Sequence, residues 1–229
     1  MNLGGFAMTD AGDCLRLAVA FVDEPYGQRL EAAYLLREAV AGAATTSSEA
    51  AVCATQLQWW RDELDRLVSG EPKHPVAQQF AERIGADVDT TQFAAEWLVD
   101  TERLLFGPVP EDTVSHRVAG YRRYGASLML ALTPELRATC APVVRDIAVA
   151  LYALDEHRND PVFDYETAMA LHDTINANAE QVADVGVAVL AATSANAMRR
   201  RYDGLKPGAV RQLRLAWRAA RRTRKNGAS

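Results

Sequence analysis

Apolar residues recur at every third or fourth position along most of the chain, which is the spacing that places side chains on one face of an α-helix. The longest series run through Leu136, Cys140, Val143, Ile147, Leu151 and Leu154, and through Ala168, Leu171, Ile175, Ala179, Val182, Val185 and Val189. No segment shows the alternation of apolar and polar residues that is typical of a strand. The pattern therefore predicts an all-α protein built as a helical bundle.

Local helix signals divide this pattern into individual helices. Residues 46–49 (Thr-Ser-Ser-Glu) have the form of a capping box, and Pro75, Pro134 and Pro207 lie where a first helical turn begins. Spacing and signals together predict helices near residues 10–21, 26–42, 47–69, 75–84, 91–105, 112–131, 134–156, 165–192, 194–203 and 208–224. Pro142 falls inside one of them, where a proline is expected to kink or split the helix.

Length and composition favour one domain. A chain of 229 residues can bury one sizeable core but is short for two independent domains, and its loops at 106–111 and 157–164 are short. Hydrophobic residues make up 49% and charged residues 24%, which is ordinary for a globular protein. We therefore expect a single domain over residues 1–229, with a basic C-terminal helix near 208–225.

Several absences bear on where the protein is found. The chain has no apolar run of about 18 residues that could span a bilayer, and its first residues lack the basic and apolar segments of a signal peptide. Cys14, Cys53 and Cys140 are an odd number at wide separations, which fits neither a disulfide framework nor a zinc site. These features predict a cytoplasmic protein, with peripheral attachment to the inner face of the membrane left open.

The most specific segment is residues 57–64, Leu-Gln-Trp-Trp-Arg-Asp-Glu-Leu, followed by residues 70–76, Gly-Glu-Pro-Lys-His-Pro-Val. It resembles the L-x-W-W-R-x-E-L helix, the Gly-containing turn and the His-Pro-Val helix start of the squalene/phytoene synthase family. Residues 29–40 are similar to the family helix that carries its first acidic motif, and residues 121–128 are weakly similar to its central tyrosine-containing helix. The resemblance covers roughly residues 15–165 and implies a helical bundle of the isoprenoid synthase type.

The resemblance also implies a set of residues that would contact a substrate or lipid: Arg37, Trp59, Trp60, Arg61, Tyr121 and Tyr124. Taken without the family, Leu57, Trp60, Leu64 and Leu67 form one apolar stripe, so the tryptophans could be core residues whose charged neighbours are solvated. A pair of tryptophans could equally wall an apolar cavity for a prenyl chain. Both interpretations remain open at this point.

Family members that make squalene or phytoene ionise an allylic diphosphate with Mg²⁺ held by two Asp-rich motifs, because hard oxygen ligands must hold the metals that neutralise the leaving group. Where the first motif is expected, residues 41–48 are Ala-Gly-Ala-Ala-Thr-Thr-Ser-Ser, and no carboxylate lies between Glu38 and Glu49. At the second, Asp160 and Asp164 keep the four-residue spacing, but the intervening Pro161 favours a turn or a helix start. We expect no cofactor, with Mg²⁺ on Asp160 and Asp164 only if the chain is an enzyme.

Positive charge is concentrated at the C-terminal end. Residues 199–225 hold eleven of the 25 Lys and Arg residues and a single acidic residue, Asp203. After Pro207 the pattern predicts a basic amphipathic helix with Leu213, Trp217 and Ala220 on one side. Such a helix suits an anionic membrane surface, which it would contact through Arg211, Arg214, Trp217, Arg218, Arg221 and Arg222. The alternative is a C-terminal helix docked on the acidic body of the chain. That body, residues 1–198 with the last four residues, has 14 basic and 29 acidic residues, and this negative balance disfavours nucleic acid as a partner.

Three functions are compatible with these observations. The first is a non-catalytic protein of this family type that binds a prenyl lipid or assists assembly of a membrane respiratory complex, as relatives without the Asp motifs do for NADH:quinone oxidoreductase. The second is a Mg²⁺-dependent prenyltransferase that condenses two prenyl diphosphates head to head, and the third is a helical interaction protein without a ligand. The missing carboxylates at residues 41–48 favour the first, since loss of metal ligands removes several kcal/mol of charge stabilisation in the transition state.

Overall fold

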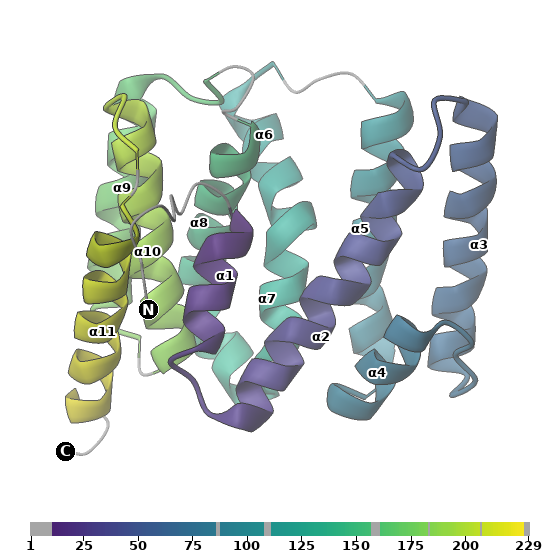
Figure 1. The fold of residues 1–229 in the computed structure, drawn as a ribbon, viewed down its shortest axis with the longest axis horizontal. Helices are drawn as coiled ribbons and strands as arrows, with labels where there is room; N and C mark the ends of the chain where they lie inside the picture. The colour runs from purple at the N-terminus through teal and green to yellow at the C-terminus, as the bar shows by residue number, and fades with distance from the viewer. Residues whose placement is uncertain are drawn as a thin grey trace. The chain divides into compact units, whose positions relative to one another are not determined.

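The computed structural model describes residues 11–85, 88–107, 111–156, 161–182, 184–206 and 208–226. These ranges contain helices and no strand, which confirms the predicted all-α class (Figure 1). The α-helices are α1 (Ala11–Val19), α2 (Glu24–Ala41), α3 (Ala50–Val68), α4 (Pro75–Arg83), α5 (Val88–Phe106), α6 (Thr113–Gly120), α7 (Ala126–Ala131), α8 (Pro134–Glu156), α9 (Tyr165–Ala179), α10 (Val185–Tyr202) and α11 (Ala209–Asn226). A 3-10 turn, η1 (Gly42–Ala44), follows α2, and a π-helical segment, η2 (Tyr121–Gly125), separates α6 from α7.

The chain divides into two compact units. The first unit comprises residues 1–27 and 134–229, and the second comprises residues 28–133. One boundary therefore lies inside α2 and the other lies between α7 and α8. The single domain expected from length and composition stays a prediction, because a compact unit need not fold independently.

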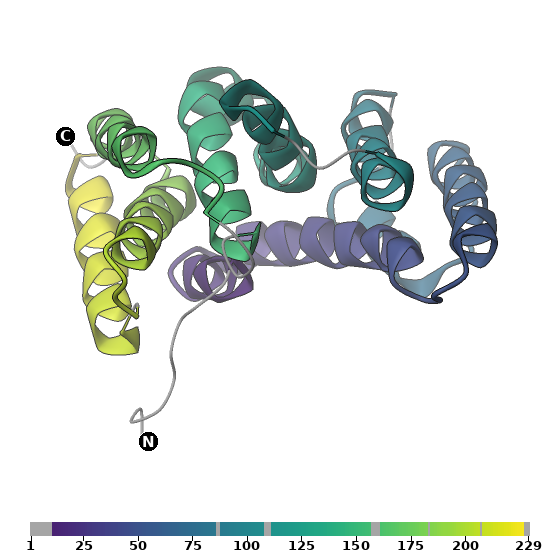
Figure 2. The same cartoon turned by 90° about the horizontal axis from the view of Figure 1, so that it is seen from above.

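In the first unit, α10 is the central helix. It packs against α1, α8, α9 and α11, and Figures 1 and 2 show it beside α9 and α11. Nearly all of its side chains from Gly186 to Met198 are buried, and most are small, as expected for a helix surrounded by others. The buried hydroxyls of Thr193 and Ser194 donate to carbonyl oxygens one turn earlier, at 2.8 and 2.6 Å, so the interior of α10 leaves neither hydroxyl hydrogen unpaired.

The break between α9 and α10 differs from the predicted one. The pattern predicted helices 165–192 and 194–203, whereas α9 ends at Ala179 and α10 begins at Val185. Asp184 is the N-cap of α10, and its carboxylate accepts a hydrogen bond from the Val187 amide at 2.8 Å. The apolar spacing continued through Val182 and Val185 and therefore concealed a break that the capping aspartate creates.

Two other local features bear on the predictions. Pro142 lies within α8 without splitting it, and a kink at this residue stays a prediction. At the start of α3 the N-cap is Glu49, which makes no side-chain cap hydrogen bond, and the Thr46 hydroxyl instead donates to the Gly42 carbonyl at 2.7 Å. Residues 46–49 therefore do not form the expected capping box.

In the second unit, α5 packs against α3, α7, η1 and η2. Its buried residues Thr90, Ala94, Trp97 and Thr101 follow helical spacing, and the Trp97 ring lies 6.2 Å from that of Phe80 on α4. The core around them is completed mainly by α2 and α3, through Ala33, Leu36, Val40, Leu57, Trp60, Leu64 and Leu67. Among the described helices of either unit, none has the length and apolar character needed to cross a bilayer.

Candidate functional site

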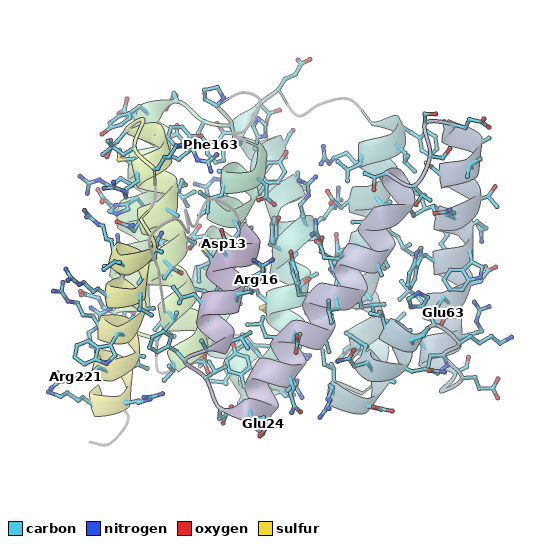
Figure 3. All side chains as sticks on the ribbon, viewed as in Figure 1. Asp13, Arg16, Glu24, Glu63, Phe163 and Arg221 are labelled. Carbon is cyan, nitrogen blue, oxygen red and sulfur yellow. The ribbon has the colours of Figure 1, made fainter. Side chains whose placement is uncertain are left out.

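The turn between α3 and α4 is organised by the carboxylate of Glu63. This side chain is fully buried, and its Oε1 accepts hydrogen bonds from the backbone amides of Lys73 and His74, each at 2.7 Å. Its Oε2 accepts from Nε of Arg66 at 2.8 Å, and Figure 3 marks Glu63 on α3. His74 then caps α4, since its Nδ1 accepts from the Val76 amide at 3.2 Å and Pro75 opens the helix.

Electrostatics at Glu63 follow from these contacts. Burial alone would raise the pKa of the Glu63 carboxyl, but the hydrogen bonds from the His74 and Lys73 amides and from the Arg66 guanidinium outweigh burial and lower the pKa. One of the two interpretations left open by the sequence had the charged neighbours of the tryptophans solvated, and for Glu63 this is wrong. The spacing contained a contrary signal, because Glu63 lies three residues after Trp60 and four before Leu67, both of which face the core.

The two adjacent tryptophans have different environments. Trp60 is buried, whereas Trp59 is 41% exposed. Their ring centroids are 5.1 Å apart, and both rings also contact the His74 ring, at 5.8 Å from Trp59 and 4.8 Å from Trp60. The Arg66 guanidinium lies over Trp59 at 5.7 Å. Trp60 thus packs as a core residue, and both tryptophans support the turn that Glu63 fixes.

Arg61 has other partners than this cluster. It forms an ion pair with Glu102 of α5 and donates to the Gln58 side chain at 3.2 Å. Its contacts therefore link α3 to α5.

A second group of predicted residues gathers at the π-helical segment η2. Arg37 of α2 is buried, its guanidinium lies 4.9 Å from the centre of the Tyr124 ring, and it forms an ion pair with Glu38. Tyr121 packs against Gly125, where an added Cβ would lie only 2.4 Å from the ring, so this position requires glycine. π-helical turns are often found at functional sites. The sequence of residues 121–125 did not predict this one.

Buried charge surrounds η2. Arg123 is buried and donates to Asp100 of α5 at 3.1 Å, and Arg103 pairs with the same carboxylate at 3.3 Å. Both buried arginines, Arg37 and Arg123, are thus already paired with carboxylates of the protein. Among the described residues, no hydrogen bond, ion pair or ring contact joins Trp59, Trp60 or Arg61 to Arg37, Tyr121 or Tyr124. The residues implied by the resemblance thus form separate clusters.

The two expected metal-binding segments have local structural roles where they are described. Residues 42–44 form the turn η1 after α2. Asp164 is the N-cap of α9, and its Oδ1 accepts from the Thr167 amide at 2.7 Å; this hydrogen bond lowers the pKa of Asp164. Asp160 lies outside the described residues. Within the described ranges, no three Cys, His, Asp or Glu side chains are grouped so that they could hold a metal ion.

The basic C-terminal helix α11 is docked on the first unit. Its inner face is made of small or polar residues, namely Gln212, Ala216, Ala219, Ala220 and Thr223, all buried. The Gln212 side chain donates to the Thr193 carbonyl of α10 at 3.2 Å. The docked alternative therefore describes this helix correctly, and Ala220 belongs to its buried face.

The outer face of α11 nevertheless exposes an apolar stripe. Val210, Leu213 and Trp217 are 50%, 42% and 52% exposed, and their spacing of three and four residues places them in one row. Beside that row lie the predicted membrane-contact arginines, all exposed: Arg211, Arg214, Arg218, Arg221 and Arg222. Figure 3 shows Arg221 projecting from this outer side. α11 is therefore docked on the first unit through one face while its other face exposes an amphipathic surface.

Comparison with known proteins gives no match, since no family model, no curated protein and no solved structure matches this chain.

Proposed function

We propose that this chain is a non-catalytic helical protein of the squalene/phytoene synthase type that acts at an anionic membrane surface. The isoprenoid synthase arrangement of its helices is part of the proposal and rests on the resemblance of residues 57–64 and 70–76. In this view Glu63, His74 and the paired tryptophans preserve the α3–α4 turn of that fold. The protein would serve as a lipid-binding or assembly module, and the resemblance implies a subunit of a membrane respiratory complex as its protein partner.

Loss of catalysis is supported by the two segments that would carry metal ligands. Residues 41–48 contain no carboxylate and form a short turn region. At the second segment, the Asp164 carboxylate is already engaged as a helix cap. A diphosphate leaving group needs its charge neutralised by metal ions, so a chain without the first motif has lost part of that machinery.

The observation that carries the membrane proposal is the outer face of α11. An exposed row of Val210, Leu213 and Trp217 flanked by arginines is the arrangement of an interfacial helix, with apolar groups for the acyl boundary and cations for the headgroups. Tryptophan favours this interface because its ring is apolar and its indole N–H is polar. Each basic side chain near an anionic surface contributes about 1 kcal/mol to the binding free energy, and dissolved salt screens this attraction beyond about 8 Å. We therefore expect salt-sensitive association while the helix remains docked.

Vesicle sedimentation tests this proposal. The full-length protein should sediment with phosphatidylglycerol vesicles, bind phosphatidylcholine vesicles far less, and dissociate as salt is raised. The variant Val210→Ser/Leu213→Ser should bind at least about fivefold more weakly, because it removes apolar contacts without removing charge. Point substitutions are preferable to truncation, since removing α11 would also remove buried residues of the first unit.

The matched control is Val114→Ser/Val118→Ser, which makes the same kind of change at exposed apolar residues of α6. It should bind as the wild type does. If wild-type protein does not bind anionic vesicles, or if both double variants bind equally, the membrane proposal is wrong.

A further inference from the structure

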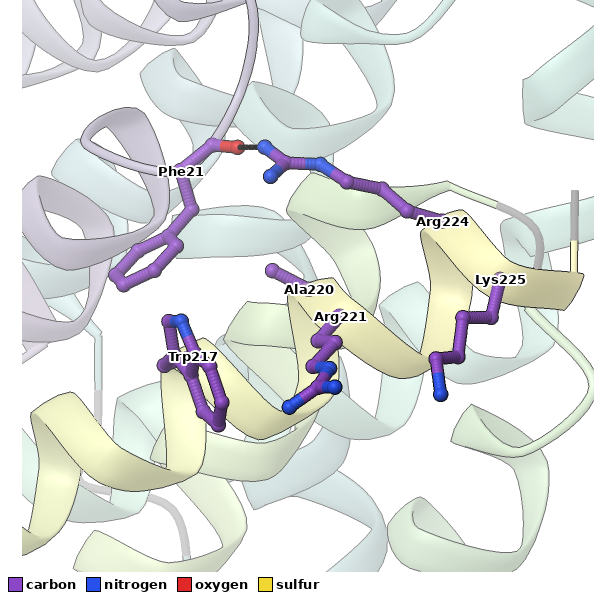
Figure 4. A pocket seen from close by; sticks show the side chains of 6 residues that line it. All are labelled: Phe21, Trp217, Ala220, Arg221, Arg224 and Lys225. Carbon is purple, nitrogen blue, oxygen red and sulfur yellow. Dashed lines mark hydrogen bonds between the residues drawn. The ribbon is translucent and has the colours of Figure 1, made fainter. Parts of the chain in front are cut away.

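A pocket in the first unit lies where the apolar row of α11 meets the segment after α1. It has a volume of about 330 Å³ and is lined by Phe21, Trp217, Ala220, Arg221, Arg224 and Lys225 (Figure 4). Figure 4 shows the two aromatic rings near one another, with Ala220 between them and the arginines. Phe21 and α11 are far apart in the sequence, so the pocket is a product of the fold and has no signature in the α11 segment alone.

The arginines of this pocket retain hydrogen-bonding capacity. Arg224 donates one hydrogen bond to the Phe21 carbonyl at 3.0 Å, which leaves most of its five N–H groups available. The Arg221 guanidinium lies over the Trp217 ring at 5.1 Å. Neither side chain forms an ion pair with a carboxylate of the described residues, in contrast to the neighbouring Arg222, which pairs with Glu180. The guanidinium groups of Arg221 and Arg224 therefore place positive charge beside two aromatic rings, and no carboxylate of the described residues pairs with either group.

We infer that this pocket binds the headgroup phosphate of an anionic phospholipid. Guanidinium groups match the geometry of phosphate oxygens and bind them with charge-assisted hydrogen bonds. The rings of Phe21 and Trp217 supply apolar surface next to the charge, as a phosphate attached to a glycerol and acyl chain requires. Trp217 also belongs to the exposed row with Leu213 and Val210, so the pocket is continuous with the face proposed to lie on the bilayer. This inference rests on the proposed function and adds a specific site to it.

Phe21 provides the sharpest test, because it carries no charge and lies outside α11. If α11 binds membranes only through its row and its overall charge, Phe21→Ala has no effect on vesicle binding. If the pocket binds a headgroup, Phe21→Ala lowers the partition coefficient onto phosphatidylglycerol vesicles by about fivefold. Phe106→Ala is the matched control, since Phe106 is an exposed phenylalanine of the second unit that does not line the pocket, and it should bind as the wild type does.

A charge-matched pair of variants provides a second test. Arg221→Gln/Arg224→Gln and Arg211→Gln/Arg218→Gln each remove two exposed cations from α11, but only the first pair lines the pocket. The pocket pair should bind about tenfold more weakly than the control pair, as expected when charge-assisted hydrogen bonds to a phosphate are lost. Circular dichroism and urea unfolding of each variant establish that it remains folded.

Inorganic phosphate distinguishes a lipid from a free anion. At constant ionic strength, phosphate should not compete with vesicles for the wild-type protein, because it lacks the apolar part that contacts Phe21 and Trp217. Full competition would assign the pocket to a free phosphate and overturn the lipid inference. Equal binding by the two arginine pairs, together with wild-type binding by Phe21→Ala, would also overturn it while leaving the membrane proposal intact. Absence of any vesicle binding by the wild type would refute both.

Discussion

Replacing Glu63 should destabilise the second unit through the turn between α3 and α4. In Glu63→Ala the amides of Lys73 and His74 lose their acceptor, and the Arg66 guanidinium loses its partner. Hydrogen bonds to a charged group contribute about 1.5–3 kcal/mol each, but these amides are partly solvated in the variant. We therefore expect a loss of about 3 kcal/mol in the free energy of unfolding, and about half that loss in Glu63→Gln, which keeps a neutral acceptor.

The pH dependence gives the prediction a sign. The folded pKa of Glu63 is lowered from the ordinary value of 4.5, so the charged form stabilises the folded state. The advantage of the wild type over Glu63→Gln is complete above the ordinary value and is lost as the pH falls through the lowered folded value. Urea unfolding at neutral and acidic pH measures it, and faster hydrogen exchange of the Lys73 and His74 amides locates the change.

Glu71→Gln is the control for this experiment, because Glu71 lies in the same loop and is exposed. It should change stability by less than about 0.5 kcal/mol. The reasoning is refuted if Glu63→Gln and Glu71→Gln are equally stable at neutral pH, or if the deficit of Glu63→Gln persists undiminished in acid.

Three further outcomes are expected. Gly186→Ala should lower stability by about 2 kcal/mol in urea unfolding, because an added Cβ would lie 2.4 Å from Cε1 of Tyr26, and a stability equal to the wild type would contradict this packing. Burial raises the pKa of Asp184 in the folded protein, so the free energy of unfolding of the wild type falls as the pH rises through the raised pKa. Asp184→Asn keeps a side chain that can cap α10 but does not titrate, so its stability relative to the wild type should be higher at neutral pH than in acid. Incubation with farnesyl or geranylgeranyl diphosphate and Mg²⁺ should release no diphosphate above buffer, whereas release that disappears in Asp160→Ala/Asp164→Ala would support the prenyltransferase alternative.

Periodicity was sufficient to predict the helical class because amphipathic helices repeat their apolar residues with the helical period. It failed where a helix changes its hydrogen bonding without changing that spacing. The predicted helix 112–131 contains η2, since Tyr121 and Gly125 satisfy a helical pattern while their close packing accompanies a π-helical turn. Asp184, which caps α10, is a helix-start signal in the sequence, but the apolar row that continues on both sides of it predicts an unbroken helix.

The candidate sites were predictable only in part, because the sequence records residue types and not their partners. One open interpretation had the charged neighbours of the tryptophans solvated, although three donors from its own helix and the following turn surround Glu63. The basic and apolar faces of α11 were visible in the sequence, but its docking through Gln212 and small residues was one of two alternatives. The sequence around Phe21 did not predict that this residue lines a pocket, because the pocket depends on contact with α11, where Arg224 donates to the Phe21 carbonyl from the other end of the chain.

Tryptophan fluorescence on vesicles tests the central claim most directly. The chain contains four tryptophans, of which Trp217 lies on the outer face of α11 and is the most exposed, at 52%. Phosphatidylglycerol vesicles with bromine on the acyl chains quench indoles that enter the acyl boundary. We predict quenching in the wild-type protein that is absent in Trp217→Phe, although both proteins still sediment with the vesicles. Bound wild-type protein without quenching, or equal quenching in both proteins, would contradict insertion of this face into the membrane surface.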